Sequence, residues 1–170
     1  GIEHLNSTAV SFSGDALKTR EGQVRVLHFL GHEYFHHYNV KRIRPIELGP
    51  FDYENGSRSR QVWISEGINV YYEYLVVKRA GITKLEETMN ALRSNIQAYE
   101  YGSGHRFQSL VGASLDTWAE GANNQSTSGA TRNDDFINKT ISYYEKGPVL
   151  GLMFDFAIRH HSQNRKSLDD

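Results

Sequence analysis

The segment at residues 32–36 places two histidines four positions apart, with a glutamate directly after the first. On a helix, His32 and His36 project from the same face, where both imidazoles can reach one metal ion. Zinc binds neutral imidazole nitrogen at about 2.0–2.1 Å. Glu33 then faces the same site and can act as a general base. The pattern therefore predicts a zinc hydrolase in which His32 and His36 are ligands and Glu33 is the base.

Apolar residues around this motif follow a helical rather than a strictly alternating spacing, at Val24, Leu27, Phe29, Leu30 and Phe35. We therefore predict a helix from about residue 22 to 38. Because the motif fixes only three identities, an ordinary amphipathic helix with two partly buried histidines is the alternative.

Two further histidines flank the motif. His28 lies four positions before His32 and shares its face, but Phe29 stands where a His28–His32 pair would need its base. His37 points about 100° away from His36. We interpret His37 as a surface residue or as a support for the ligands, not as a ligand.

A catalytic zinc site needs a third protein ligand, and residues 63–75 are the obvious source. This segment is rich in aromatic and aliphatic residues, as in a buried helix, yet it contains Glu66. Burying a carboxylate without a cation is costly, and a metal ion removes that cost. Glu73 lies two helical turns further on the same face. It is expected to support the site, to face the substrate, or to be an exposed helix residue.

Six segments, taken in chain order, resemble the corresponding segments of a known family. They are HEYFH at 32–36, NVKRIRP at 39–45, FDYE at 51–54, WISEGINVYYEYL at 63–75, RAGI at 79–82 and SYYEKG at 142–147. Together they are similar to the bacterial glycyl aminopeptidases, whose full-length members commonly carry a PDZ domain. More distantly, the segments at 63–75 and 143–147 resemble aminopeptidase N and leukotriene A4 hydrolase.

The resemblance implies a mainly α fold, the helical lobe of a thermolysin-like zincin (gluzincin) catalytic domain. The strand lobe would be represented only by residues 1 to about 12. Residues 1–170 would then be part of a longer protein, with an N-terminal β domain before them and a PDZ domain after them. The implied activity is zinc-dependent hydrolysis of the N-terminal peptide bond of a peptide substrate, with a preference for Gly or Ala.

The resemblance also implies roles for single residues. Glu66 becomes the third zinc ligand, Tyr144 the donor to the oxyanion of the reaction, and Glu3 the group that binds the free α-amino group of the substrate. A phenol with a pKa of about 10 is neutral at pH 7 and can donate in this way. From the residues alone Tyr143 is an alternative, because adjacent tyrosines also suit packing at a helix start. The sequence departs from the family at Asn69, where threonine is common.

The composition of the chain argues against several other classes of function. With no cysteine, the chain has neither disulfides nor thiolate metal sites. A net charge of -1 gives no electrostatic case for nucleic acid. No apolar run approaches the roughly 18 residues of a membrane span. We interpret the basic residues Lys41, Arg42 and Arg44 as part of a loop at the rim of the active site or of a solvated face. Compartment and oligomeric state are left open.

Further helices are expected at about 61–80, 84–99, 108–120 and 147–161, with a long irregular connection over 39–60. Gly81 is expected to end one helix, and residues 83–86 resemble a capping box that starts the next. Residues 121–135 read as a mobile surface loop. Two other functions stay open: a zincin endopeptidase, if Glu3 does not select free N-termini, and a non-catalytic helical scaffold.

Overall fold

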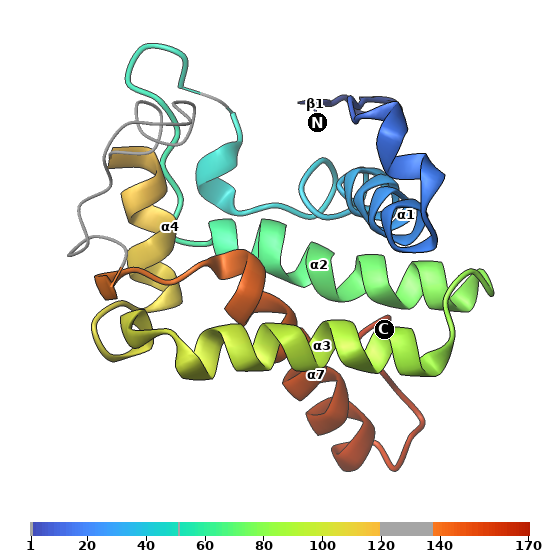
Figure 1. Cartoon of the computed structure of the whole chain (residues 1–170). Coiled ribbons are helices and arrows are strands. Elements are labelled where there is room, and N and C mark those ends of the chain that lie inside the picture. Colours follow the sequence, from blue (N-terminus) through green and yellow to red (C-terminus); the bar gives the residue numbers. More distant parts are fainter. Residues whose placement is uncertain (1, 51, 120–137) are drawn as a thin grey trace.

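The computed structural model describes residues 2–50, 52–119 and 138–170, and helices dominate it (Figure 1). Side chains are described from residue 4 onwards, except that of residue 119. In chain order the elements are β1 (Ile2–Glu3), β2 (Thr8–Ala9), η1 (Gly14–Lys18), α1 (Arg20–Phe35), η2 (Ile46–Leu48), α2 (Val62–Arg79), α3 (Leu85–Tyr101), η3 (Ser103–Arg106), α4 (Leu110–Ala119) and α7 (Tyr143–His161). The predicted mainly α fold is confirmed. No described helix is long and apolar enough to cross a membrane.

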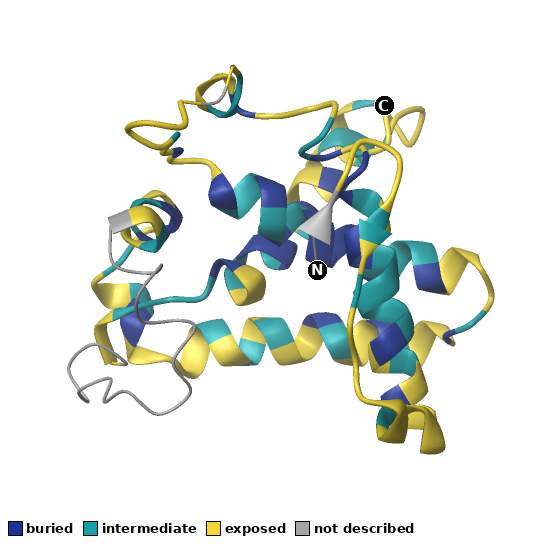
Figure 2. Ribbon diagram, turned by 90° about the horizontal axis from the view of Figure 1, so that it is seen from above, coloured by how far each residue is buried: buried dark blue, intermediate teal, exposed yellow. Residues whose placement is uncertain are grey.

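Helix α2 is the central element, and α1, α3, α4 and α7 all pack against it. Buried residues gather where the helices face one another (Figure 2). One apolar cluster joins Val70, Tyr71, Tyr72 and Tyr74 of α2 to Leu92 of α3. A second cluster lies at the start of α2 and combines Val62, Leu110, Ala113 and Tyr143. Because α2 is buried on several sides, it is a rigid support for the residues it carries.

Helices α2 and α7 touch at a pair of glycines. A Cβ placed on Gly67 would lie 2.6 Å from the Cα of Gly147 and 2.7 Å from the carbonyl oxygen of Tyr143. Real side chains do not approach backbone this closely, so only glycine permits the contact. This contact lies next to Glu66 and fixes the beginning of α7 against the beginning of α2.

Helix α1 begins and ends slightly earlier than the predicted range of 22–38. The hydroxyl of Thr19 accepts a hydrogen bond from the backbone N–H of Gly22 at 3.1 Å and caps the first turn. At the other end, His36 is the C-cap residue, with helical dihedral angles, and its N–H donates to the carbonyl of His32 at 3.2 Å. The two histidines therefore keep the one-turn spacing that the motif requires.

Helix α7 begins at Tyr143, four residues before the predicted start at 147. The hydroxyl of Ser142 accepts from the backbone N–H of Tyr144 at 3.2 Å and caps the helix. Pro148 lies inside the helix and cannot donate to the carbonyl of Tyr144. The side-chain amide of Asn95 donates to that carbonyl instead, at 3.4 Å. The predicted start was wrong, because the Ser142 cap begins the helix four residues earlier and Pro148 is tolerated inside it.

The predictions for helix ends and loops were partly confirmed. Gly81 follows α2 with a φ of +74°, as expected of the residue that ends a helix. The capping box of α3 differs from the prediction, because the carboxylate of Glu87, not of Glu86, accepts from the N–H of Lys84 at 2.8 Å. Thr83 is buried instead of capping the helix. The described part of 39–60 is irregular apart from η2 and a single bridge between Asn39 and Ile43. The loop predicted at 121–135 lies outside the described residues.

The glycine contact predicts that Gly67→Ala destabilises the fold. The added methyl group must push α7 away from α2, and overpacking of this kind costs about 1–3 kcal/mol. Thermal or urea unfolding measures the change. Gly14→Ala is the matched control, since a Cβ on Gly14 meets nothing within 4 Å. Equal stability of the two variants would contradict the close approach of α2 and α7.

Candidate metal centre

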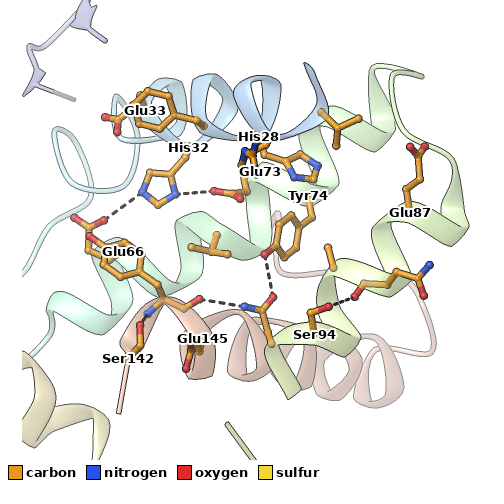
Figure 3. Close-up of a pocket in the computed structure, with 18 of the residues that line it drawn as sticks. His28, His32, Glu33, Glu66, Glu73, Tyr74, Glu87, Ser94, Ser142 and Glu145 are labelled. Atoms are coloured by element: carbon orange, nitrogen blue, oxygen red, sulfur yellow. Dashed lines mark hydrogen bonds and ion pairs between the residues drawn. The ribbon is translucent and has the colours of Figure 1, made fainter. Parts of the chain in front are cut away.

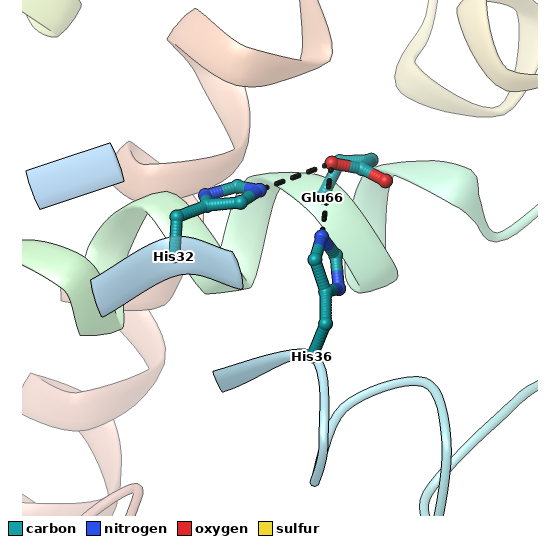
Figure 4. A group of neighbouring side chains, drawn as sticks. All are labelled: His32, His36 and Glu66. Carbon is teal, nitrogen blue, oxygen red and sulfur yellow. Dashed lines mark hydrogen bonds and ion pairs between the residues drawn. The ribbon is translucent and has the colours of Figure 1, made fainter. Parts of the chain in front are cut away.

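Three side chains converge where the end of α1 faces the first turns of α2 (Figure 4). Glu66 Oε2 lies 3.2 Å from His32 Nε2 and 3.5 Å from His36 Nε2. One ligand atom from each residue can be chosen so that all three lie within 4.8 Å of one another. His32 and His36 are buried, and the Glu66 side chain is 23% exposed. The structure thus brings together the three residues that the sequence predicts as metal ligands.

The donor set suits zinc. Two imidazole nitrogens and a carboxylate oxygen are the ligands of many catalytic zinc sites, with a fourth position left open. Tetrahedral coordination at about 2.0–2.1 Å separates neighbouring donor atoms by about 3.3 Å. The measured separations of 3.2 and 3.5 Å are close to this value. Both histidines are therefore placed at a suitable distance from Glu66 to share one zinc ion with it, and all three donor atoms lie within 4.8 Å of one another.

A second carboxylate holds the other side of His32. Glu73 Oε2 lies 2.9 Å from His32 Nδ1 (Figure 3). Of the three expectations for Glu73, support of the site agrees with this contact. An exposed position does not, because its side chain is only 13% exposed. A carboxylate on Nδ1 keeps a proton there, so Nε2, which faces Glu66, is the nitrogen that would bind a metal.

The two carboxylates dominate the electrostatics. Burial lowers the pKa of His32, but its hydrogen bonds with Glu66 and Glu73 outweigh burial and raise that pKa to about 9. Burial raises the pKa of Glu66, but its hydrogen bonds with His32 and His36 outweigh burial and lower that pKa to about 2. Without a metal, an imidazolium therefore balances the buried carboxylate.

A cleft of about 1050 Å³ opens over these residues (Figure 3). It runs between α1 and α3, and Glu33 lines it together with the three candidate ligands. Glu33 is buried, with 5% of its surface exposed. A carboxylate at this position lies beside the metal site and at the edge of a space large enough for a peptide segment.

The structure distinguishes the two tyrosines. Tyr144 lines the cleft, and its ring lies 6.2 Å from that of His32. Tyr143 is buried in the apolar cluster, where the hydroxyl of Thr117 donates to its phenol oxygen at 3.4 Å. Burial of its phenol and the nearby Glu66 carboxylate raise the pKa of Tyr144, although 44% of the residue is exposed. A neutral phenol thus faces the cleft, as the choice of Tyr144 over Tyr143 requires.

Glu3 lies in the hairpin of β1 and β2, where it pairs with Thr8. Its side chain lies outside the described part of the structure, so its predicted contact with the substrate amine stays a prediction. Arg42 ties the hairpin to the end of the motif helix. Its guanidinium donates to the carbonyl of Leu5 at 3.0 Å and to that of His37 at 2.6 Å. Arg42 is thus a structural link, which its basic character alone did not indicate.

The flanking histidines do not join the three candidate ligands. His28 lines the cleft further along α1, and its ring lies 5.0 Å from that of Tyr74. Burial lowers the pKa of His28, although Glu73 and Glu87 oppose this effect. His37 is buried with 9% exposure. Of the two expectations for His37, the surface position was therefore wrong, and its ring packs 5.3 Å from that of Tyr34.

Sequence reasoning missed two asparagines that support the site. Asn39 follows the motif and contacts the ring of His36 through its carbonyl oxygen, at 3.0 Å from Nδ1. Asn95 of α3 accepts from the Tyr74 hydroxyl at 2.9 Å and donates to the carbonyl of Tyr144. Neither residue has a spacing signal, because each acts across more than one element. Asn69 did carry a signal, as a departure from the family pattern.

Comparisons with known proteins agree with this geometry. A family model described as M61 glycyl aminopeptidase matches residues 25–150, which include the candidate ligands, Glu33 and Tyr144 but not Glu3. The chain is also similar to the crystal structure of an aminopeptidase N family protein from Idiomarina loihiensis, with 26% identity and a TM-score of 0.76. That similarity covers 87% of this chain and 24% of that protein. No protein with a curated description matches the chain.

The paired charges predict how the stability of the metal-free protein depends on pH. The His32 pKa rises from 6.5 to about 9 on folding, so its stabilising contribution is complete below pH 6.5 and is lost as pH rises through 9. The Glu66 pKa falls from 4.5 to about 2, so its contribution is complete above pH 4.5 and is lost as pH falls through 2. The contribution of the pair is therefore largest between pH 4.5 and 6.5.

Thermal unfolding in the presence of a chelator, from pH 4 to 9.5, tests this dependence. Glu66→Gln should flatten the loss of stability above pH 6.5, because the neutral amide no longer favours protonated His32. Glu86→Gln, an exposed change on α3, should leave the loss as it is. The same loss in both variants would show that the Glu66 carboxylate does not pair with His32.

Proposed function

Because the chain belongs to the M61 glycyl aminopeptidase family, we propose that it forms the metal-binding part of a zinc-dependent aminopeptidase. The observation that carries the proposal is the convergence of His32, His36 and Glu66 beside a large cleft. The substrate is a peptide with a free N-terminus, and the N-terminal residue is preferably Gly or Ala.

His32, His36 and Glu66 would hold the zinc ion. When bound, zinc acts as a Lewis acid that activates water and polarises the carbonyl of the peptide bond. Glu33 accepts the proton of the attacking water and returns it to the leaving amine. The Tyr144 phenol donates a hydrogen bond to the developing oxyanion. Its raised pKa supports this role, because the phenol keeps its proton over the pH range of the reaction.

Glu3 would bind the α-amino group and so limit cleavage to the first residue. Its place in a paired strand supports this role, and the Arg42 contacts hold that hairpin near the end of α1. If Glu3 does not bind the amine, the same centre acts as an endopeptidase. Peptides with free and acetylated N-termini separate the two activities, since an aminopeptidase cleaves only the free form.

A non-catalytic scaffold is the rival of a different class. In that case zinc would be structural, with a fourth protein ligand in place of water, or absent. The cleft argues for the enzyme, because it leaves space beside the three donors. The chain spans 24% of the protein from Idiomarina loihiensis. We propose that residues 1–170 are the helical lobe of the catalytic domain, and that a β domain and a PDZ domain complete the protein.

Glu33→Gln should lower the rate of hydrolysis about 10²–10⁴-fold, because the amide cannot accept the proton. Zinc content should stay at one ion per chain, since Glu33 is not a ligand. Hydrolysis of an alanyl peptide and elemental analysis of the same sample give both values. Glu86→Gln serves as the exposed control on α3 and should change neither. Loss of zinc together with activity would count against Glu33 as the base.

Tyr144→Phe should lower kcat by about 10²–10³-fold with little change in KM, because the lost hydrogen bond acts in the transition state. Tyr143→Phe is the matched control on the neighbouring residue. It should leave kcat unchanged and cost no more than about 1 kcal/mol of stability, because Thr117 keeps the carbonyl of Ala113 as an acceptor at 3.0 Å. A larger loss of kcat in Tyr143→Phe than in Tyr144→Phe would reverse the assignment.

A further inference from the structure

The ring of His36 has two polar neighbours at Nδ1, the nitrogen that faces away from Glu66. The carbonyl oxygen of Asn39 lies 3.0 Å from Nδ1, and the side-chain amide nitrogen of Asn69 lies 2.7 Å from it. All three residues are buried, and Asn69 has no exposed surface. In this dry environment, the direction of each hydrogen bond determines where the proton of His36 sits.

The neighbours of Asn69 fix the orientation of its amide. The amide nitrogen of Asn39 donates to the backbone carbonyl of Ile64 at 2.9 Å, and a carbonyl can only accept. The same nitrogen lies 2.8 Å from Asn69 Oδ1 and donates to it. Asn69 therefore turns its oxygen toward Asn39 and its NH₂ group toward His36.

An NH₂ group can only donate, so it is satisfied when His36 Nδ1 accepts. This contact favours the neutral tautomer of His36 that carries its proton on Nε2. A metal ion on Nε2 requires the other tautomer, with the proton on Nδ1. In that tautomer Nδ1 donates to the Asn39 carbonyl, and the Asn69 amide loses its acceptor on the ring. The Asn39 carbonyl, 3.4 Å from the Asn69 amide nitrogen, is then the nearest replacement.

The two histidines of the centre are thus prepared in opposite ways. At Nδ1, His32 faces the Glu73 carboxylate, which can only accept and so keeps on Nδ1 the proton that metal binding at Nε2 requires. His36 faces an amide that favours the competing tautomer.

We propose that Asn69 is a positioning residue that sets the tautomer of His36 and thereby weakens the affinity of the centre for zinc. The Asn69 amide stabilises the Nε2-protonated ring, and zinc must displace that proton before it binds. The effect on affinity rests on the proposed function, because it requires zinc at this centre. The tautomer of the metal-free protein does not depend on that function.

Nitrogen-15 NMR of the imidazole rings in the metal-free wild-type chain, at a pH where His36 is neutral, tests the tautomer directly. The Nε2-protonated form of His36 is expected, whereas His32, whose pKa is raised to about 9, carries a proton on both nitrogens below that pH. Asn69→Asp should convert His36 to the Nδ1-protonated form, because both carboxylate oxygens accept. A wild-type His36 that already carries its proton on Nδ1 would overturn the proposal.

Zinc affinity, measured by competition with a chromogenic chelator, tests the consequence. Asn69→Asp should bind zinc about tenfold more tightly, in the range that partners of ligand histidines contribute. Asn69→Leu removes the donor without adding charge and should also bind more tightly than wild type. Asn164→Asp, an exposed change after α7, should not alter the affinity. If Asn69 only supports the packing of the site, both Asn69 variants bind zinc more weakly, and the proposal is wrong.

The two kinds of failure are distinguishable. A wild-type chain that binds no zinc contradicts the proposed function. The NMR spectrum of the metal-free chain then still shows whether Asn69 sets the tautomer of His36. If Asn69→Asp does not fold, Asn69→Leu and the wild-type spectrum decide it instead. Tight zinc binding by wild type with no gain in either folded variant contradicts the inference and leaves the proposed function intact.

Discussion

A carboxylate between two imidazoles is the interaction around which this chain is built. Glu66 lies within 3.5 Å of ring nitrogens of both His32 and His36. An isolated carboxylate at this depth would be costly, so α1 and α2 must meet at this point and in this orientation. The glycine contact between α2 and α7, one residue beyond Glu66, then fixes the start of α7 and brings Tyr144 to the same cleft. Fold and site therefore share one set of contacts.

The two histidines of the centre have different hydrogen-bond partners at Nδ1. Glu73 supplies an acceptor to His32, whereas Asn69 supplies a donor to His36. Carboxylates raise the pKa of His32 to about 9 in the absence of a metal, so a metal ion must displace protons at neutral pH. A site of this kind keeps its buried charges balanced whether or not a metal is bound.

Much of this arrangement could be predicted from the sequence, because it depends on helical periodicity. The spacing of His32 and His36 and the buried character of the segment around Glu66 are local, and the structure brings these residues together. The start of α7 was missed because Pro148 lies inside the helix, and the contact that tolerates it there comes from Asn95 of another helix. The amide network was missed for the same reason, since 30 positions separate Asn39 from Asn69.

We expect His32, His36 and Glu66 to bind one catalytic zinc ion. The most direct measurement is X-ray absorption at the zinc edge on the zinc-loaded chain, with metal content determined on the same sample. The expected result is one zinc per chain, two imidazole nitrogens and two oxygens at about 2.0–2.2 Å, and loss of the ion in Glu66→Ala. A correctly folded chain that takes up no zinc, or a zinc ion retained unchanged in Glu66→Ala, would show that these three residues do not form a zinc site.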